Sequence, residues 1–354
     1  MPEGRIRPVS KVSQRASVER HDAKLKSLCV LGSVSSQQDA LPVCCCKQIA
    51  NKSTSTMKFN RLLLALFLFF SVALRPAHAE DKLAIASFST ILTEIAQKVG
   101  GQEVTVTGLI QPGQDPHEFQ LSPSDLQSVN GARLVLTSGK NLEHYFNNLR
   151  DATKADLLPV GDKLPSLKMQ AGEDEKTAKS GFIEDPHWWN SVPNVEKATF
   201  IVRDELVKLD PAHADEYRTN AQSYANQLEQ LNSWVKQKIA ELPRDQRKLV
   251  TSHDAFQYFA KEYGFKIYSI EGLSTEDEPS LRHVSDLIDQ IRKQHVKAIF
   301  LESALNPKVS VEITRESGAK TGGTLYADGL GTGDGATFEG MIKHNVTTIV
   351  DALK

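Results

Sequence analysis

After residue 46 the chain contains no cysteine. The four cysteines of its 354 residues are Cys29, Cys44, Cys45 and Cys46. Disulfides, iron–sulfur clusters, thiolate zinc sites and cysteine nucleophiles are therefore excluded from the rest of the chain.

The chain also lacks an excess of charge of either sign. It has 42 Lys and Arg residues against 44 Asp and Glu residues, a net charge of −2. A nucleic-acid-binding domain is normally strongly basic, so nucleic acid is not an expected partner. Apolar residues make up 40% of the chain, enough for a globular core, and 354 residues suggest about two domains.

The apolar run Leu62–Leu74 is about 13 residues long, too short to cross a hydrocarbon core of roughly 30 Å as an ordinary helix. Basic residues precede the run from Met57 on, and the small-residue site Ala77-His78-Ala79 follows it. This arrangement predicts a signal peptide over 57–79, cleaved after Ala79. A buried or anchoring helix is the alternative.

Residues 1–56 precede this complete signal and show no periodic apolar pattern. We expect them to be a non-structural N-terminal extension, with Met57 as the physiological start. The mature chain, Glu80–Lys354, contains no cysteine that a lipid anchor would need. We therefore expect a soluble protein in the periplasm of a Gram-negative bacterium.

Short apolar runs alternate with amphipathic helical patterns along the mature chain, which is typical of parallel α/β sheets. The runs fall into two series of four. The expected strands are Leu83–Ser87, Val104–Leu109, Leu134–Thr137 and Leu157–Val160, then Leu249–Thr251, Lys266–Ile270, Ala298–Leu301 and Thr324–Tyr326.

A long helical pattern separates the two series. Ala212–Leu242 has no glycine or proline, carries apolar residues at helical spacing and is ended by Pro243. A helix of this length would extend roughly 45 Å. The fold class expected is α/β, with two lobes (80–211 and 244–354), each a mostly parallel four-stranded sheet flanked by helices, joined by one rigid helix (212–243).

Two shorter segments also carry local predictions. The sequence Ser122-Pro123-Ser124-Asp125 predicts the start of a helix, because proline is tolerated in a helix's first turn. The segment Lys168–Ser180 is polar and has no periodicity, which predicts a mobile surface loop.

Two histidines share one local pattern, Asp115-Pro116-His117 and Asp185-Pro186-His187. A residue before proline is pushed toward extended geometry, so each motif sets a turn of defined direction. Each aspartate can also orient the neighbouring imidazole through its second ring nitrogen, as carboxylates do around metal sites.

Two further side chains follow predicted strands directly: His253 after Leu249–Thr251, and Asp328 after Thr324–Tyr326. His117, His187, His253 and Asp328 are thus all expected in loops at the carboxyl ends of strands, where open α/β sheets bind ligands. Three imidazoles and one carboxylate suit zinc, whereas manganese takes more oxygen ligands. A single such histidine is more often an ordinary surface or core residue, but four placed alike favour a site.

The remaining histidines of the mature chain are expected to be ordinary surface residues: His144, His213, His283, His295 and His344. The pair Trp188-Trp189 can wall the site against water, and core packing explains it equally well.

These residues resemble the cluster A-I solute-binding proteins, the zinc- and manganese-binding components of ABC importers. The resemblance covers essentially the whole mature chain. It rests on QPGQDPHEFQLSPSD (111–125), DPHWW (185–189), TSHDAF (251–256), GLSTEDEPS (272–280) and YADGL (326–330), together with the long helix.

The resemblance implies two lobes bridged by a rigid helix, with one metal ion at their interface. The four ligand positions of the family match His117, His187, His253 and Asp328. Zinc members are the more similar, because manganese members typically carry glutamate where His253 stands. Zinc members often also have a histidine-rich loop, and the corresponding segment here, 168–180, has no histidine.

The function implied is that of a monomeric periplasmic protein that captures Zn²⁺ as transported ligand. It would deliver the ion to an inner-membrane ABC permease with its ATPase. A manganese- or iron-selective member of the same class is the alternative, and Mn²⁺ remains a possible cargo.

An enzyme is the rival class, in the form of a secreted zinc hydrolase. Catalytic zinc keeps an open position for water, whereas here four protein ligands are predicted, with no exchangeable water. Glu118 is the one candidate base, but no H-E-x-x-H is present. The segment Gly331–Ala336 formally matches a dinucleotide fingerprint, but a helix is expected after it and not the strand that would supply the acidic residue. We therefore expect no catalytic residue and no bound cofactor.

Overall fold

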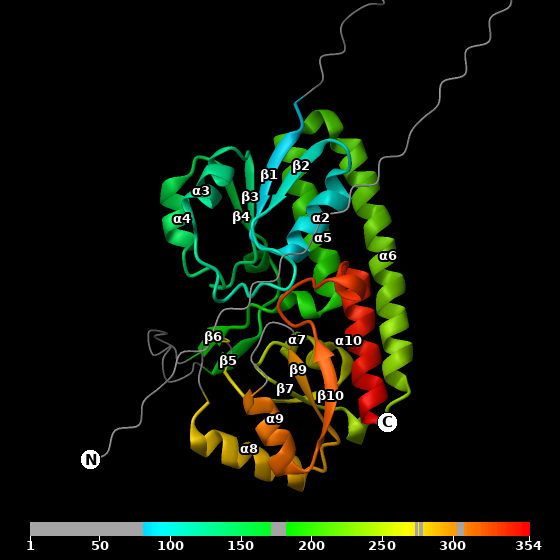
Figure 1. The fold of residues 1–354 in the computed structure, drawn as a ribbon. Coiled ribbons are helices and arrows are strands. Elements are labelled where there is room, and N and C mark those ends of the chain that lie inside the picture. The colour runs from blue at the N-terminus through cyan, green and yellow to red at the C-terminus, as the bar shows by residue number, and fades with distance from the viewer. Residues whose placement is uncertain (1–80, 171–181, 273–274, 276–278, 303–307) are drawn as a thin grey trace, which may run out of the picture. The chain divides into compact units, whose positions relative to one another are not determined.

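The computed structural model describes residues 81–170, 182–272, 275, 279–302 and 308–354 (Figure 1). The chain divides into two compact units, Met1–Pro76 and Ala77–Lys354, and the described residues all belong to the second. The predicted extension and signal peptide, 1–56 and 57–79, lie outside the described residues, as does most of the predicted loop Lys168–Ser180.

The first four strands form one parallel sheet in the order β2-β1-β3-β4. Successive side chains of a strand point to opposite faces, so Ile85 and Ala86 of β1 enter different apolar clusters. The strands are β1 (Leu83–Ser87), β2 (Val104–Gly108), β3 (Leu134–Thr137) and β4 (Asp156–Pro159).

The second four strands form another parallel sheet, in the order β10-β9-β7-β8. The strands are β7 (Lys248–Thr251), β8 (Lys266–Ser269), β9 (Ala298–Glu302) and β10 (Lys320–Leu325). Two parallel four-stranded sheets flanked by helices confirm the fold class predicted from the alternating patterns.

Helices cover both faces of each sheet (Figure 1). Ser122 caps α3 and Asp125 bonds back to it, so the helix start predicted there is confirmed. The helices around the first sheet are α2 (Thr90–Gly100), α3 (Pro123–Asn130), α4 (Phe146–Ala152) and α5 (Val192–Leu209). Those around the second are α7 (Gln257–Tyr263), α8 (Leu281–Lys293), α9 (Lys308–Ser317) and α10 (Phe338–Leu353).

The long helix is α6 (Ala214–Ala240), which runs beside both sheets in Figure 1. Its 27 residues correspond to about 40 Å of length. A short 3₁₀ turn at Pro211–His213 precedes it, so the helix begins two residues later than predicted. Its buried stripe packs on α2, α5 and α10.

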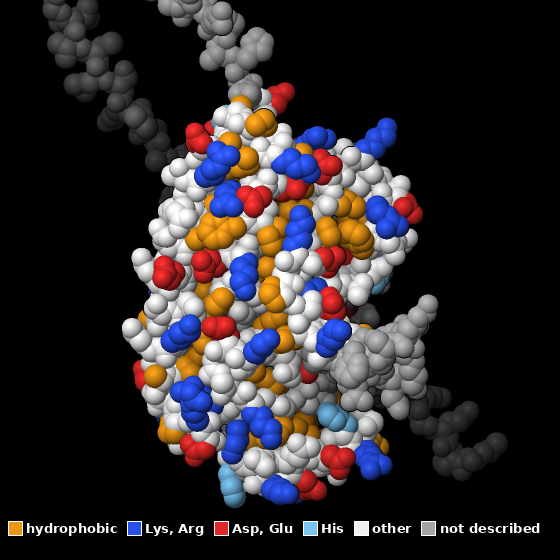
Figure 2. Space-filling view, turned by 180° about the vertical axis from the view of Figure 1, so that it is seen from behind, with side chains coloured by type: hydrophobic (Ala, Val, Ile, Leu, Met, Phe, Trp, Pro, Cys, Tyr) orange, Lys and Arg blue, Asp and Glu red, His pale blue; other side chains and the backbone are white. Residues whose placement is uncertain are grey.

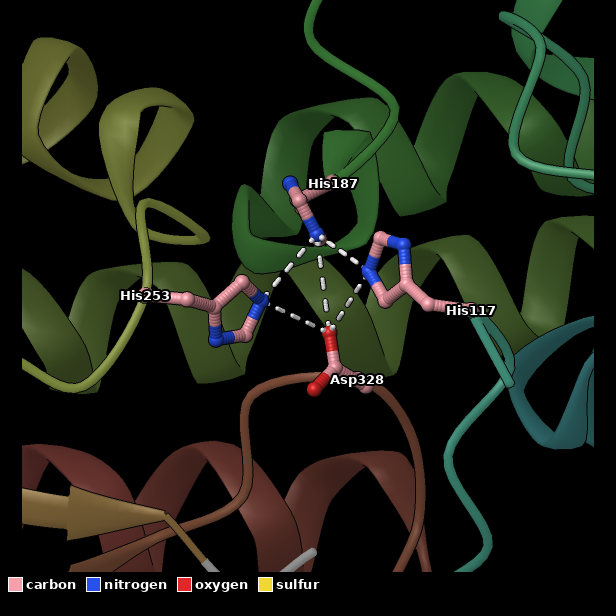
Figure 3. Close-up of side chains that lie close together, drawn as sticks. All are labelled: His117, His187, His253 and Asp328. Carbon is pink, nitrogen blue, oxygen red and sulfur yellow. Dashed lines mark hydrogen bonds and ion pairs between the residues drawn. The ribbon is translucent and has the colours of Figure 1, made fainter. Parts of the chain in front are cut away.

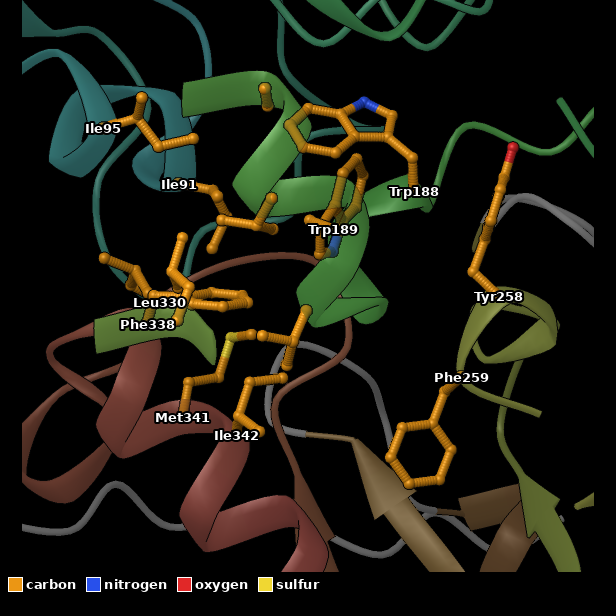
Figure 4. Packing of buried hydrophobic residues seen from close by; sticks show 14 of the residues in the cluster. Ile91, Ile95, Trp188, Trp189, Tyr258, Phe259, Leu330, Phe338, Met341 and Ile342 are labelled. Atoms are coloured by element: carbon orange, nitrogen blue, oxygen red, sulfur yellow. The ribbon is translucent and has the colours of Figure 1, made fainter. Parts of the chain in front are cut away.

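One apolar cluster extends through both lobes rather than stopping at their boundary. Trp188 and Trp189 are fully buried at its centre, between Ile91 of α2 and Met341 and Ile342 of α10 (Figure 4). Both tryptophans therefore belong to the core. Because a close-packed interior resists deformation, the shared core ties the two lobes together.

Two predictions of local structure were wrong. Lys168–Gln170, the part of the predicted loop that the structure describes, is a strand, β5, which pairs antiparallel with β6 (Phe182–Glu184). Strand β10 begins at Lys320 rather than Thr324 and includes Gly322 and Gly323. A side chain at Gly322 would overlap the Phe300 ring, and the register with β9 shifts beside Gly323.

Lys and Arg side chains alternate with Asp and Glu over the face seen in Figure 2. The described part of the chain contains no helix long and apolar enough to cross a membrane.

Candidate metal centre

The structure brings together all four side chains that the sequence singles out as ligands (Figure 3). One ligand atom from each lies within 4.8 Å of the others. His117 comes from the loop between β2 and α3, and His253 and Asp328 follow β7 and β10. His187 follows β6 rather than a strand of a four-stranded sheet, so its expected placement was wrong in that detail.

The spacing of the ligand atoms fits one small ion. His187 Nε2 lies 3.1 Å from His117 Nε2 and 3.3 Å from His253 Nε2. Asp328 Oδ1 lies 3.6, 3.5 and 3.2 Å from the Nε2 atoms of these three imidazoles in chain order. Four donors about 2.0–2.1 Å from a tetrahedral ion lie about 3.3 Å apart. Five of the six spacings match this value.

The two Asp-Pro-His motifs hold their histidines differently. Asp185 Oδ1 accepts hydrogen bonds from the backbone N–H of His187 (2.9 Å) and from its Nδ1 (2.9 Å). Asp115 Oδ1 accepts the backbone N–H of His117 (2.8 Å), but its Oδ2 accepts the Thr275 hydroxyl (2.7 Å). The predicted orientation of the imidazole is therefore confirmed for Asp185, whereas Asp115 fixes the loop.

Glu302 is a site residue that the sequence reasoning missed. Its Oε1 accepts the backbone N–H of His253 at 3.1 Å, and its Oε2 is hydrogen-bonded to His253 Nδ1. An Nδ1 that donates to a carboxylate leaves Nε2 free to bind a metal. A signal was present, since an acidic residue ends the apolar run of β9, the strand between those that lead to His253 and Asp328.

The electrostatics of the site favour a cation. Burial lowers the pKa of His187 and so keeps its imidazole neutral. Burial raises the pKa of Asp328, but attraction to His253 and His117 outweighs burial and holds it well below the usual value. Both carboxylate oxygens of Asp328 are buried and have no hydrogen-bond partner among the described residues. The neighbours of this ionised, buried carboxylate within 3.6 Å are the three imidazoles, and a bound cation would stabilise it further.

The environment of His253 in the metal-free site favours the protonated imidazole. Burial lowers its pKa, but attraction to Asp328 and Glu302 outweighs burial and places the pKa well above the usual value. A metal ion must displace this proton, because only the neutral imidazole is a ligand.

The other five histidines do not join this group in the described chain. His144, His283 and His295 are exposed as predicted, whereas His213 and His344 are half-buried and pair with Asp210 and Asp334. Glu118, the candidate base of the hydrolase alternative, is exposed and lies outside the group.

The glycines of Gly331–Ala336 have a packing role. A side chain at Gly331 or Gly335 would overlap the ring of Tyr326. The motif that matches a dinucleotide fingerprint therefore folds around an aromatic ring.

Comparison with known proteins shows which family the chain belongs to. Residues 85–352 match the family described as "ZnuA: Zinc-uptake complex component A periplasmic". The chain belongs to this family. It is 36% identical over 286 residues to the manganese-binding lipoprotein MntA of Bacillus subtilis (strain 168), covering 78% of this chain and 91% of that protein.

Zinc-binding relatives are also present. The zinc-binding protein TroA of Treponema pallidum (strain Nichols) is 31% identical over 292 residues, covering 79% of this chain and 91% of that protein. The solved structure of periplasmic zinc-binding TroA from Treponema pallidum matches with a TM-score of 0.71 at 28% identity, over 77% of this chain and 99% of that one. The chain is thus a metal-binding substrate-binding protein of an ABC transporter, and the hydrolase alternative was wrong.

Proposed function

We propose that this protein captures Zn²⁺ in the periplasm and delivers it to the permease of an ABC importer. The observation that carries the proposal is the buried group of three imidazoles around the Asp328 carboxylate, with one ligand atom of each residue within 4.8 Å of the others. In this proposal His117, His187 and His253 bind the ion through Nε2, and Asp328 binds it through Oδ1. Asp185 and Glu302 hold two of the imidazoles in the orientation that metal binding needs.

The donor set favours zinc over manganese. Three nitrogens and one oxygen at nearly tetrahedral spacing match structural and transported zinc, whereas manganese takes more oxygen donors. The sixth spacing, between the ligand atoms of His117 and His253, is also within 4.8 Å.

Manganese is the second candidate cargo, and one observation favours it. Oδ2 of Asp328 is buried without a hydrogen-bond partner, so it can serve as an additional oxygen donor to a larger ion. The manganese-binding relative MntA is at least as similar to this chain as the zinc-binding relative TroA.

The proposed organisation has lobes at 80–211 and 244–354, with the helix at 212–243 between them. The apolar cluster that runs through both lobes supports small rocking and local loop movement on capture, rather than wide closure. We further propose a monomer without a lipid anchor, exported by the signal at 57–79.

The test must separate cargo from intrinsic affinity, because a nitrogen-rich site binds Zn²⁺ more tightly than Mn²⁺ whatever it transports. We expect protein isolated from its own periplasm, without added metal, to contain one Zn²⁺ per chain. Loss of the gene should slow growth when zinc is chelated and be corrected by added Zn²⁺ but not Mn²⁺. Manganese as the bound metal, with rescue by Mn²⁺ alone, would establish the second candidate instead.

A further inference from the structure

Asn190 lies in the 3₁₀ turn Trp188–Asn190 and is 1% exposed. Its Nδ2 donates to the carbonyl oxygens of Ala255 and Ala327, both at 3.0 Å. Ala255 stands two residues after His253, and Ala327 stands directly before Asp328. One side chain thus bonds to two of the loops that carry ligands.

The backbone of Asn190 bonds to a third ligand-carrying segment, the one that contains His187. Its N–H donates to the carbonyl oxygen of His187 at 3.1 Å. We propose that Asn190 is a positioning residue that sets the spacing of His187, His253 and Asp328 around the ion. The inference rests on the proposed function, since it assigns Asn190 a part in metal binding at that site.

The chemistry of the contact selects asparagine. Two carbonyl oxygens accept hydrogen bonds here, and a primary amide presents two N–H donors from one nitrogen. A carboxylate presents none, and a hydroxyl presents one. The reversed amide would put its oxygen against both carbonyls, so Asn190 keeps this orientation although its Oδ1 is buried and has no partner among the described residues.

Trp189 supports the same connection. Its Nε1 donates to the carbonyl oxygen of Ala327 at 2.8 Å, so this oxygen receives two donors from the turn. The Trp189 indole also packs edge-on against the imidazole of His187, with ring centroids 5.4 Å apart. The loop that carries Asp328 is therefore held by the turn beside His187 as well as by β10.

The spacing matters because metal bonds tolerate little error, about 0.2 Å in a well-formed site. His253 and Asp328 approach the ion from different strands of the second sheet, and His187 comes from outside that sheet. Asn190 connects all three at their backbones, so loss of its amide releases the loops relative to one another without removing a ligand.

The decisive variant is Asn190→Asp, which sets a carboxylate against two carbonyl oxygens. We expect the dissociation of Zn²⁺ into excess chelator to be at least about tenfold faster than in the wild type. Loss of a group that supports a metal ligand typically costs about 10–100-fold in affinity, and tenfold is the lower end of that range. The visible spectrum of the Co²⁺-loaded protein, which reports ligand geometry, should change as well. The matched control is Asn220→Asp, because Asn220 is a half-buried asparagine whose Nδ2 donates to the Val99 carbonyl at 3.2 Å, away from the site. The control should keep the wild-type rate and spectrum.

A second variant and a metal-free measurement keep the inference testable if Asn190→Asp folds poorly. Asn190→Ala leaves room for a water that can donate to both carbonyls, so its dissociation rate should lie between wild type and Asn190→Asp. Hydrogen exchange of the metal-free variants should be faster at residues 253–256 and 326–330 only. Wild-type exchange, spectrum and rate in both Asn190 variants would overturn the assignment. A wild-type protein that binds no metal would instead overturn the proposed function, and the exchange result would still decide the role of Asn190.

Discussion

At the scale of single residues, two of the proposed ligands, His187 and His253, are held by a carboxylate that is hydrogen-bonded to their second ring nitrogen. Asp185 is hydrogen-bonded to Nδ1 of His187, and Glu302 to Nδ1 of His253. The Nε2 atoms of both imidazoles are therefore free to face one another. Asp328 has no such partner in the described chain, and its charge is balanced by the imidazoles around it. A bound cation would take over this role by pairing with the carboxylate directly.

The substitution His253→Ala removes one of three nitrogen donors, and it also removes the imidazole that is hydrogen-bonded to Glu302. We expect zinc affinity to fall by more than about 100-fold, beyond the 10–100-fold typical of changes outside the ligand set. Competitive titration against a chromophoric chelator measures the change. His283→Ala is the matched control, because the imidazole of this exposed histidine bonds to the Ser269 carbonyl at 3.1 Å and lies outside the site. Equal affinity in the two variants would show that His253 is not a ligand.

Metal capture should also depend on pH. Burial lowers the pKa of His253, but attraction to Asp328 and Glu302 outweighs burial and raises it, so we expect protons to compete with the metal for this imidazole. Affinity should therefore fall by up to about tenfold per pH unit as pH falls below that pKa, from near neutrality toward about 5. Titrations across this range measure the slope. The lowered pKa of His187 means that this imidazole competes only at more acidic pH. A constant affinity down to about pH 5 would contradict proton displacement.

At the scale of elements, most of the architecture follows from local pattern. The strands of both sheets, the long helix and the capped start of α3 are encoded by periodicity, proline and capping residues within a few positions. Those signals do not depend on distant parts of the chain. This locality is why the fold class and the order of elements could be predicted from the sequence.

The features that the sequence did not reveal arise from distant contacts. Strand β5 exists because it pairs with β6, and its polar sequence alone gives no strand signal. Gly322 lies inside β10 because the Phe300 ring of the neighbouring strand needs its space. The four candidate ligands were found from their positions after strands, whereas Glu302 and Asn190 act through residues 49 or more positions away.

At the scale of the whole described molecule, α6 and the apolar cluster through both lobes limit movement. Glu94 of α2 adds a polar connection, since it accepts hydrogen bonds from the Tyr224 hydroxyl at 2.9 Å and from the Phe338 backbone N–H at 2.8 Å. These residues belong to α2, α6 and α10. The connection is buried and does not involve the metal.

We therefore expect small-angle scattering profiles of the metal-free and zinc-loaded protein to superimpose. Their radii of gyration should agree within experimental error, because a packed interior opposes hinge motion. A clear compaction on adding zinc would show that the lobes close as independent bodies. Zinc added to the His253→Ala variant at the same concentration controls for effects of the ion outside the site.

The core around Trp188 and Trp189 has a consequence for engineering and for evolution. Either half made alone would expose the apolar surface that now faces these indoles, and such a fragment should aggregate rather than remain in solution. Halves taken from different relatives should likewise combine poorly unless the contacts of the tryptophan pair are exchanged with them. We therefore expect the metal preference of this protein to change through substitutions within one scaffold, and not through exchange of whole lobes between relatives.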